Sequence, residues 1–355
     1  MKRREFLKIG ACGLAAIAAE TSGLPLFLRR PVAHAATVTA NLTLTEVLVE
    51  MVDLTQVFMW VFADANGPHF PGPVISAIEG DTININLTNG TTQPHSFAIP
   101  RVVASGVINP GQTKNLTFPT PPAGTYIYLD PLNEPVNRMM GLHGVFVVSP
   151  AAGNTPYRNP TPQVQALFND LGTSVEFPGS PWVPARTFIW IFHQIDPFLN
   201  NFMLNNPPVS PATFMRNFLP RYFTINGKSG FFSSHDPTIS PRGRVGQPAL
   251  IRNVNVGLAT HSPHIHGNHV YILSENERPQ NNVFLVDTWT MRPLDRKDVL
   301  LPFIKPPDIP AAVWPPVQET FPLMYPMHCH MEMSQTSGGG NYPQGLVTDW
   351  VIEGP

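Results

Sequence analysis

The sequence is poor in cysteine, in charged residues and in long hydrophobic runs. Its 355 residues include two cysteines, Cys12 and Cys329, and Cys12 lies in the leader described below, so no disulfide framework is expected. Charged residues make up 13% of the chain; the absence of basic runs argues against nucleic acid as a partner. There is no Gly-rich phosphate loop, serine-nucleophile elbow or CxxC pair, so a hydrolase or nicotinamide-dependent enzyme has no support. Beyond the leader, no segment is apolar over enough residues to span a membrane.

The N-terminus has the features of an export leader. Lys2-Arg3-Arg4-Glu5-Phe6-Leu7-Lys8 carries a twin arginine, a short apolar run from Ile9 to Ala19 follows, and Ala33-His34-Ala35 is a small-residue cleavage site. The apolar run is shorter than the ~20 residues of a membrane anchor and ends at Glu20. We therefore predict a twin-arginine signal over residues 1–35 and a periplasmic or extracellular location.

The rest of the chain is typical of an all-β protein. Its 41 prolines suit short strands joined by turns better than long helices. In the first half, the segments that fit strands are 39–52, 56–62, 82–87, 114–118, 125–129 and 144–148. In the second half they are 187–192, 222–225, 249–256, 269–273, 283–290, 298–302 and 346–352. This spacing predicts two tandem β-sandwich domains, 36–150 and 186–355, with residues 151–185 as a Pro-, Gly- and Asn-rich linker.

The chemistry-bearing residues are concentrated in two short motifs of the second domain. One motif is His261-Ser262-Pro263-His264-Ile265-His266, and the other is His328-Cys329-His330. In an extended segment neighbouring side chains point to opposite faces, so His328 and His330 share one face and Cys329 the other. Two such strands side by side would place four imidazoles on one face and a sulfur–imidazole pair on the other. Thiolate with imidazole is the ligand set of copper electron-transfer sites, and imidazole alone suits copper, zinc or iron.

At these motifs the chain resembles the multicopper oxidases, specifically their short two-domain bacterial members, which are tandem cupredoxin-like Greek-key sandwiches. Further similarity is carried by the segments Phe70-Pro71-Gly72-Pro73-Val74-Ile75, Gly124-Thr125-Tyr126-Ile127-Tyr128 and 140–148. The resemblance implies copper as the cofactor, with His261 and Cys329 at the type 1 copper, His264 at the type 2 copper, and His266, His328 and His330 at the type 3 pair. It also implies a homotrimer, because in such relatives first-domain histidines of one subunit meet the second domain of the next.

Several ligands of the family pattern are replaced in this chain. Of the two His-x-His pairs expected in the first domain, only His95 remains; Phe97 takes the second position, and Leu129-Asp130-Pro131 replaces the other pair. Ser334 stands where the second type 1 histidine is expected, and Leu346 takes the axial methionine position. We therefore expect a divergent member with an incomplete ligand set, whose candidate metal ligands are His95, His261, His264, His266, His328, Cys329 and His330.

Three functions fit this ligand set. The first is an exported copper-dependent oxidoreductase that takes electrons from a small molecule or a metal ion and passes them to dioxygen. The second is a copper-free or catalytically silent cupredoxin scaffold, which the lost ligands favour. The third is copper storage or delivery without turnover.

Overall fold

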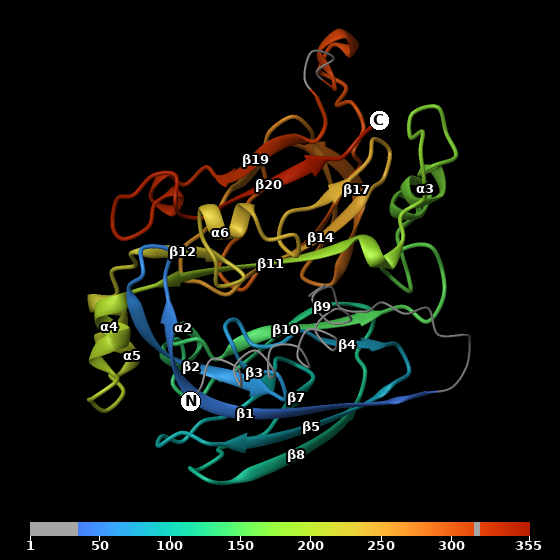
Figure 1. Ribbon diagram of the computed structural model, residues 1–355. Helices are drawn as coiled ribbons and strands as arrows, with labels where there is room; N and C mark the ends of the chain where they lie inside the picture. Colours follow the sequence, from blue (N-terminus) through green and yellow to red (C-terminus); the bar gives the residue numbers. More distant parts are fainter. Residues whose placement is uncertain (1–34, 316–319) are drawn as a thin grey trace, which may run out of the picture.

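The computed structural model describes residues 35–315 and 320–355, so the predicted leader, apart from Ala35, lies outside the described residues. Within them the chain forms two β-sandwiches stacked one on the other (Figure 1). The all-β prediction of two tandem sandwiches is confirmed. In Figure 1 the blue and green strands of the N-terminal half form the lower sandwich, and the yellow to red strands form the upper one.

The first sandwich consists of two five-stranded sheets. One has the order β3 (Gly67–His69), β2 (Gln56–Asp64), β1 (Thr37–Glu50), β5 (Thr82–Asn89) and β8 (Thr113–Pro119). The other has the order β4 (Ile75–Ile78), β10 (His143–Ser149), β9 (Gly124–Leu129), β6 (Ala98–Ile99) and β7 (Val103–Ala104). Buried and half-buried residues alternate strictly along β5, as they do when one face of a sheet covers the core.

The second sandwich pairs a six-stranded with a four-stranded sheet. The larger has the order β12 (Tyr222–Ile225), β11 (Thr187–Ile195), β14 (Ala249–Asn255), β18 (Arg296–Leu301), β16 (Val270–Glu275) and β17 (Arg278–Val286). The smaller has the order β13 (Arg242–Gly243), β20 (Val347–Ile352), β19 (Leu323–Cys329) and β15 (Pro263–Ile265). Trp190, Trp350 and Cys329 are fully buried members of the core between these sheets.

The two sandwiches meet through β9 and β10 on one side and β11 and β14 on the other. The contact is an aliphatic layer of Ile127, Leu129, Val145, Val147, Ile189, Ile191, Val254 and Val256. This second packed face explains why every residue of β11 and nearly all of β10 are buried, since a strand covered on both faces has no solvent side.

The segment predicted as a linker packs against the second sandwich. It contains α3 (Pro162–Asp170) and the 3-10 turn η1 (Pro184–Arg186), and Thr161 caps α3 through its hydroxyl. Val164, Leu167 and Phe168 of α3 contact Leu250, Leu273 and Leu300 of the larger sheet. The segment is thus held by apolar contacts rather than spanning free space.

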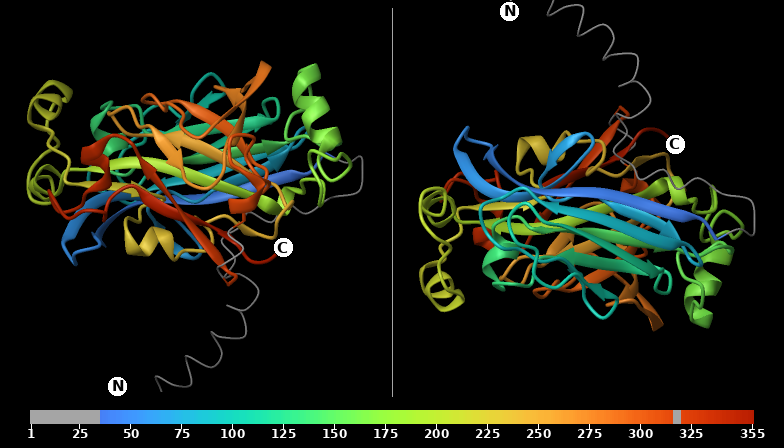
Figure 2. Two further views of the ribbon diagram at one scale, coloured as in Figure 1. Left: turned by 90° about the horizontal axis from the view of Figure 1, so that it is seen from above. Right: turned by 90° about the horizontal axis from the view of Figure 1, so that it is seen from below.

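The remaining helices are short and lie in loops. They are α2 (Val136–Met139), α4 (Pro197–Phe202), α5 (Pro211–Asn217), α6 (Phe231–Ser234), η2 (Ala311–Val313) and η3 (Glu332–Gln335). Figure 2 shows α4 and α5 at one end of the molecule and α3 at the other. Among the described residues no helix has the length and apolar character needed to cross a membrane.

Candidate metal centre

The two histidine motifs lie on adjacent strands. β15 pairs antiparallel with β19, so that His264 stands opposite His328 and Pro263 opposite Cys329. His266 and His330 follow at the ends of these strands and are exposed, whereas Cys329 is fully buried. The alternation of a strand therefore divides the motifs into an outer imidazole face and an inner sulfur face.

The outer face brings four imidazoles together: His264, His266, His328 and His330, which we call the imidazole cluster. The ring centroids of His264 lie 4.7 Å from those of His266, 5.4 Å from His328 and 4.6 Å from His330. The candidate ligand atoms of His264, His328 and His330 lie within 4.8 Å of one another. The Nε2 atoms of His266 and His328 are 3.1 Å apart.

The surroundings of the cluster favour the neutral form of three of its imidazoles and orient the His264 ring. The pKa values of His264, His266 and His328 are lowered, first by partial burial and then by neighbouring imidazoles of the cluster. His264 Nδ1 lies 2.9 Å from the Thr288 hydroxyl and 3.1 Å from the Asp287 carbonyl. Because a carbonyl can only accept, the proton of His264 lies on Nδ1 and its Nε2 lone pair is left available.

The donor atoms of the cluster fit a metal ion. Two nitrogens that each lie about 2.0 Å from one ion are separated by roughly 2.9–3.3 Å, and the measured 3.1 Å between His266 and His328 falls in this range. Neutral imidazole is the protonation state that a metal requires. An all-imidazole set suits copper, zinc or iron.

The inner face contains Cys329, His261 and Ser334. The Nδ1 atom of His261 lies 3.6 Å from Cys329 Sγ and 3.3 Å from Ser334 Oγ. Phe192 and Phe223 pack against the His261 ring. Burial lowers the pKa of His261 to about 4 and raises the pKa of the Cys329 thiol.

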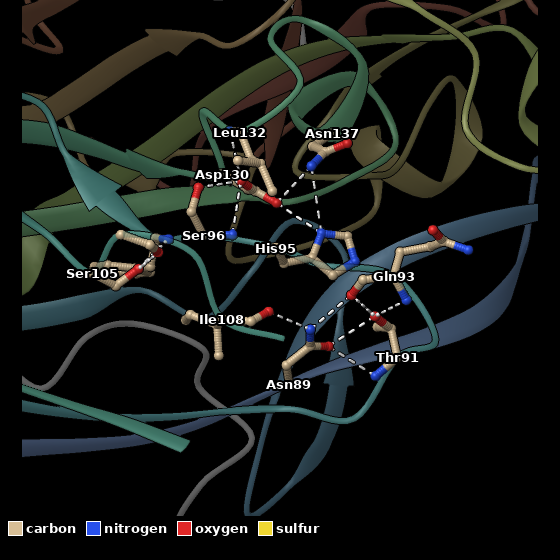
Figure 3. A network of polar contacts seen from close by, with 12 residues as sticks. Asn89, Thr91, Gln93, His95, Ser96, Ser105, Ile108, Asp130, Leu132 and Asn137 are labelled. Carbon is tan, nitrogen blue, oxygen red and sulfur yellow. Dashed lines mark hydrogen bonds and ion pairs between the residues drawn. The ribbon is translucent and has the colours of Figure 1, made fainter. Parts of the chain in front are cut away.

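His95 lies in the other sandwich, inside a buried polar network (Figure 3). Its Nδ1 lies 2.7 Å from Asp130 Oδ2, and Asp130 also accepts hydrogen bonds from Ser96, Leu132 and Asn137. The His95 Nε2 atom is buried and makes no hydrogen bond within the described structure. A histidine that donates Nδ1–H to a carboxylate keeps its Nε2 lone pair free, as metal-ligating histidines do.

Comparisons with known proteins agree with this geometry. Residues 55–153 match the family model described as multicopper oxidase. Among solved structures, the blue copper oxidase from Nitrosomonas europaea matches with a TM-score of 0.66 and 22% identity, over 89% of this chain and 86% of that one. The multicopper oxidase mgLAC matches with a TM-score of 0.65 and 21% identity, over 90% and 86%.

A copper nitrite reductase from Nitrosomonas europaea also matches, with a TM-score of 0.58 and 19% identity, over 89% of this chain and 94% of that one. No curated protein sequence matches significantly. At these identities the structural likeness shows the fold, so the predicted cupredoxin-like sandwiches and the resemblance to multicopper oxidases are confirmed. The family match and the fold together support a copper oxidoreductase type of function.

The structure separates the seven predicted ligands into three places. The imidazole cluster contains four of them, and His261 and Cys329 lie behind it on the inner face. His95 is not brought to the cluster: the contacts described for it come from Trp60, Ile108, Asp130 and Asn137 of its own sandwich.

The inner face does not fit a type 1 copper. It offers one imidazole and one thiol, with Ser334 and the fully buried Leu346 in the other two positions. Blue copper sites use two imidazoles and a thiolate, and the raised pKa of Cys329 favours the protonated thiol.

Two residues that organise these sites were not identified from the sequence as having this role. Asp130 anchors His95, although an Asp-Pro pair reads as an ordinary turn. Gln194 contacts Nε2 of His261 at 2.8 Å, and nothing in the sequence of β11 marks this glutamine. Asp130 lies 35 residues along the chain from His95, and Gln194 lies 67 residues from His261. No local spacing in the sequence could therefore reveal either contact.

Proposed function

We propose that this chain is an exported copper-binding protein and a divergent copper-dependent oxidoreductase, with its copper held by His264, His266, His328 and His330. The observation that carries this proposal is the convergence of four imidazoles from two paired strands. Copper held there would supply a one-electron acceptor for a reducing substrate.

The protein's own contribution is to orient and to expose the ligands. Thr288 and the Asp287 carbonyl fix the His264 ring through Nδ1. His266 and His330 lie at the surface, which favours direct approach of a small-molecule or metal-ion donor and of dioxygen. The substrate is proposed only as a class, because the fold hosts several chemistries.

Export and assembly belong to the same proposal. We assign residues 1–35 as a twin-arginine signal, 36–150 and 186–355 as the two cupredoxin-like domains, and 151–185 as the linker. A homotrimer would allow the first domain of one copy, with His95, to approach the cluster of the next. Light scattering on the purified protein tests this: a copper-loaded monomer would exclude a shared site.

Copper storage or delivery is one alternative. Met331 directly follows His330, Met333 lies two residues further on, and both are exposed. Thioethers are soft ligands that suit Cu(I). The other alternative, a copper-free or catalytically silent scaffold, is favoured by the ligands missing from the first domain.

An oxidase assay on copper-loaded protein separates the three. We expect oxygen uptake with a phenolic or cuprous donor, and a loss of at least about tenfold in the His264→Ala, His328→Ala double variant, since two of four ligands are removed. His235→Ala is the matched control, because this exposed histidine stacks on Phe231 outside the cluster. A copper-loaded but inert protein would indicate delivery, and a stable protein that binds no copper would indicate a scaffold.

A further inference from the structure

We propose that Gln194 fixes His261 in the tautomer that carries its proton on Nδ1, and thereby closes the inner face of the β15–β19 pair, at Cys329, to copper. Gln194 is a positioning residue in this proposal: it acts on the metal preference of the protein through His261. The inference rests on the proposed function only in leaving the imidazole cluster as the copper site.

The orientation of the Gln194 amide is set by two backbone donors. Its Oε1 atom accepts hydrogen bonds from the backbone N–H groups of Leu258, at 2.9 Å, and Ala259, at 3.1 Å. If the amide nitrogen stood there instead, its own N–H groups would face the two backbone N–H groups, and no hydrogen bond could form. The oxygen must therefore point to the 258–259 backbone and the NH2 group to the other side.

The NH2 group of Gln194 then determines the proton on His261. It lies 2.8 Å from His261 Nε2, and because an amide NH2 can only donate, His261 Nε2 must accept. A neutral imidazole has one N–H, which is left for Nδ1. That atom faces Ser334 Oγ at 3.3 Å and Cys329 Sγ at 3.6 Å, both of which can accept a hydrogen bond.

This tautomer is the wrong one for a metal at Cys329. The separation of 3.6 Å between sulfur and nitrogen is one that a shared ion would also give, so distance alone does not decide. The decisive feature is the proton, which occupies the lone pair that copper would need. Moving it to Nε2 would place N–H against the Gln194 NH2 group, and both side chains are fully buried, away from water.

His264, which we assign to copper, differs from His261 in this respect. His264 donates Nδ1–H to oxygen acceptors and presents a free Nε2. In His261 the Gln194 NH2 group donates to Nε2, so Nδ1, the nitrogen nearest Cys329, carries the proton. The same residue type is thus prepared for a metal on the outer face and for a hydrogen bond on the inner face.

Nitrogen NMR on the metal-free protein tests the tautomer directly. In a two-bond ¹H–¹⁵N correlation spectrum assigned from the backbone, we expect protonated Nδ1 and unprotonated Nε2 for His261. The isosteric Gln194→Glu variant should reverse the two, because its carboxylate keeps the backbone contacts and accepts from Nε2–H. Protonated Nε2 in the wild type would overturn the proposal, whatever the fate of the variant.

Copper loading gives a second test. Ser334→His alone should not produce the intense thiolate-to-copper band in the visible, because His261 still presents a proton. Ser334→His with Gln194→Glu should produce it and add about one copper per chain, through two imidazoles and a thiolate. A full band in Ser334→His alone would contradict the role of Gln194. Absence of copper from the imidazole cluster would contradict the proposed function and leave the NMR result unaffected.

Discussion

Two buried histidines face each other where the sandwiches meet. His143 on β10 and His193 on β11 have ring centroids 4.6 Å apart, and neither ring reaches solvent. Burial lowers the pKa of His143 to about 3 and lowers that of His193 well below its usual value. The Nδ1–H of His143 donates to the Arg138 carbonyl. Both imidazoles are therefore neutral in the folded protein.

The free energy of unfolding should decrease as the pH falls from about 6.5 towards 4, because the usual pKa of histidine is about 6.5. In that window the unfolded chain binds protons that the native His143 and His193 do not, so each group costs up to about 1.4 kcal/mol per pH unit. The stability that they contribute is fully present above the unfolded pKa. Denaturant unfolding of the metal-free protein across this range measures the slope. In the His143→Gln variant the free energy of unfolding should depend less steeply on pH, by the equivalent of about one proton taken up on unfolding. An unchanged pH dependence would contradict the assignment of both histidines as neutral.

The sequence was sufficient to predict which residues of the metal motifs share a face. The period of two along a strand places Cys329 in the core and His328 on the cluster, and the structure agrees. The sequence was not sufficient to predict the hydrogen-bond partners of buried histidines. Asp196 caps α4, while His193 packs on His143. Such pairings depend on how distant strands are placed.

At the scale of elements, a buried polar cluster joins the two sandwiches to the segment between them. Asp298 on β18 accepts hydrogen bonds from Thr125 on β9, from Arg252 on β14 and from Tyr157, at 2.9–3.0 Å. The Arg252–Asp298 ion pair is almost completely buried. Each partner therefore relies on the other to balance its charge.

Asp298→Ala should destabilise the protein by about 3–5 kcal/mol, because it leaves the Arg252 guanidinium buried without its counter-ion. Denaturant unfolding measures the loss. Arg101→Ala is the matched control: it removes the exposed Arg101–Glu277 pair and should cost less than about 1 kcal/mol. Equal effects of the two substitutions would contradict the account of this cluster.

Strands were the more predictable elements. Alternation and turn residues located β5, β9 and β12 to within two residues, since burial of one face fixes the pattern. Helices α4 and α5 were not predicted. Each begins with a capping side chain followed by proline, but six or seven residues are too few to show a helical period.

At the scale of the whole molecule, the imidazole cluster lies at the surface of the second sandwich and His95 lies buried in the first. The cluster could hold an ion with ligands from one chain alone, since His264, His328 and His330 converge. The inner face, with one imidazole and one thiol, has no comparable set of metal ligands. We therefore predict a protein whose copper binding does not depend on Cys329.

Copper content after loading and removal of free metal tests this claim most directly. We expect about one copper or more per chain in the wild type, from a cluster of four imidazoles. The Cys329→Ser variant should keep the same amount, and the His264→Ala, His328→Ala double variant should lose most of it. Loss of copper in Cys329→Ser with retention in the double variant would contradict the account.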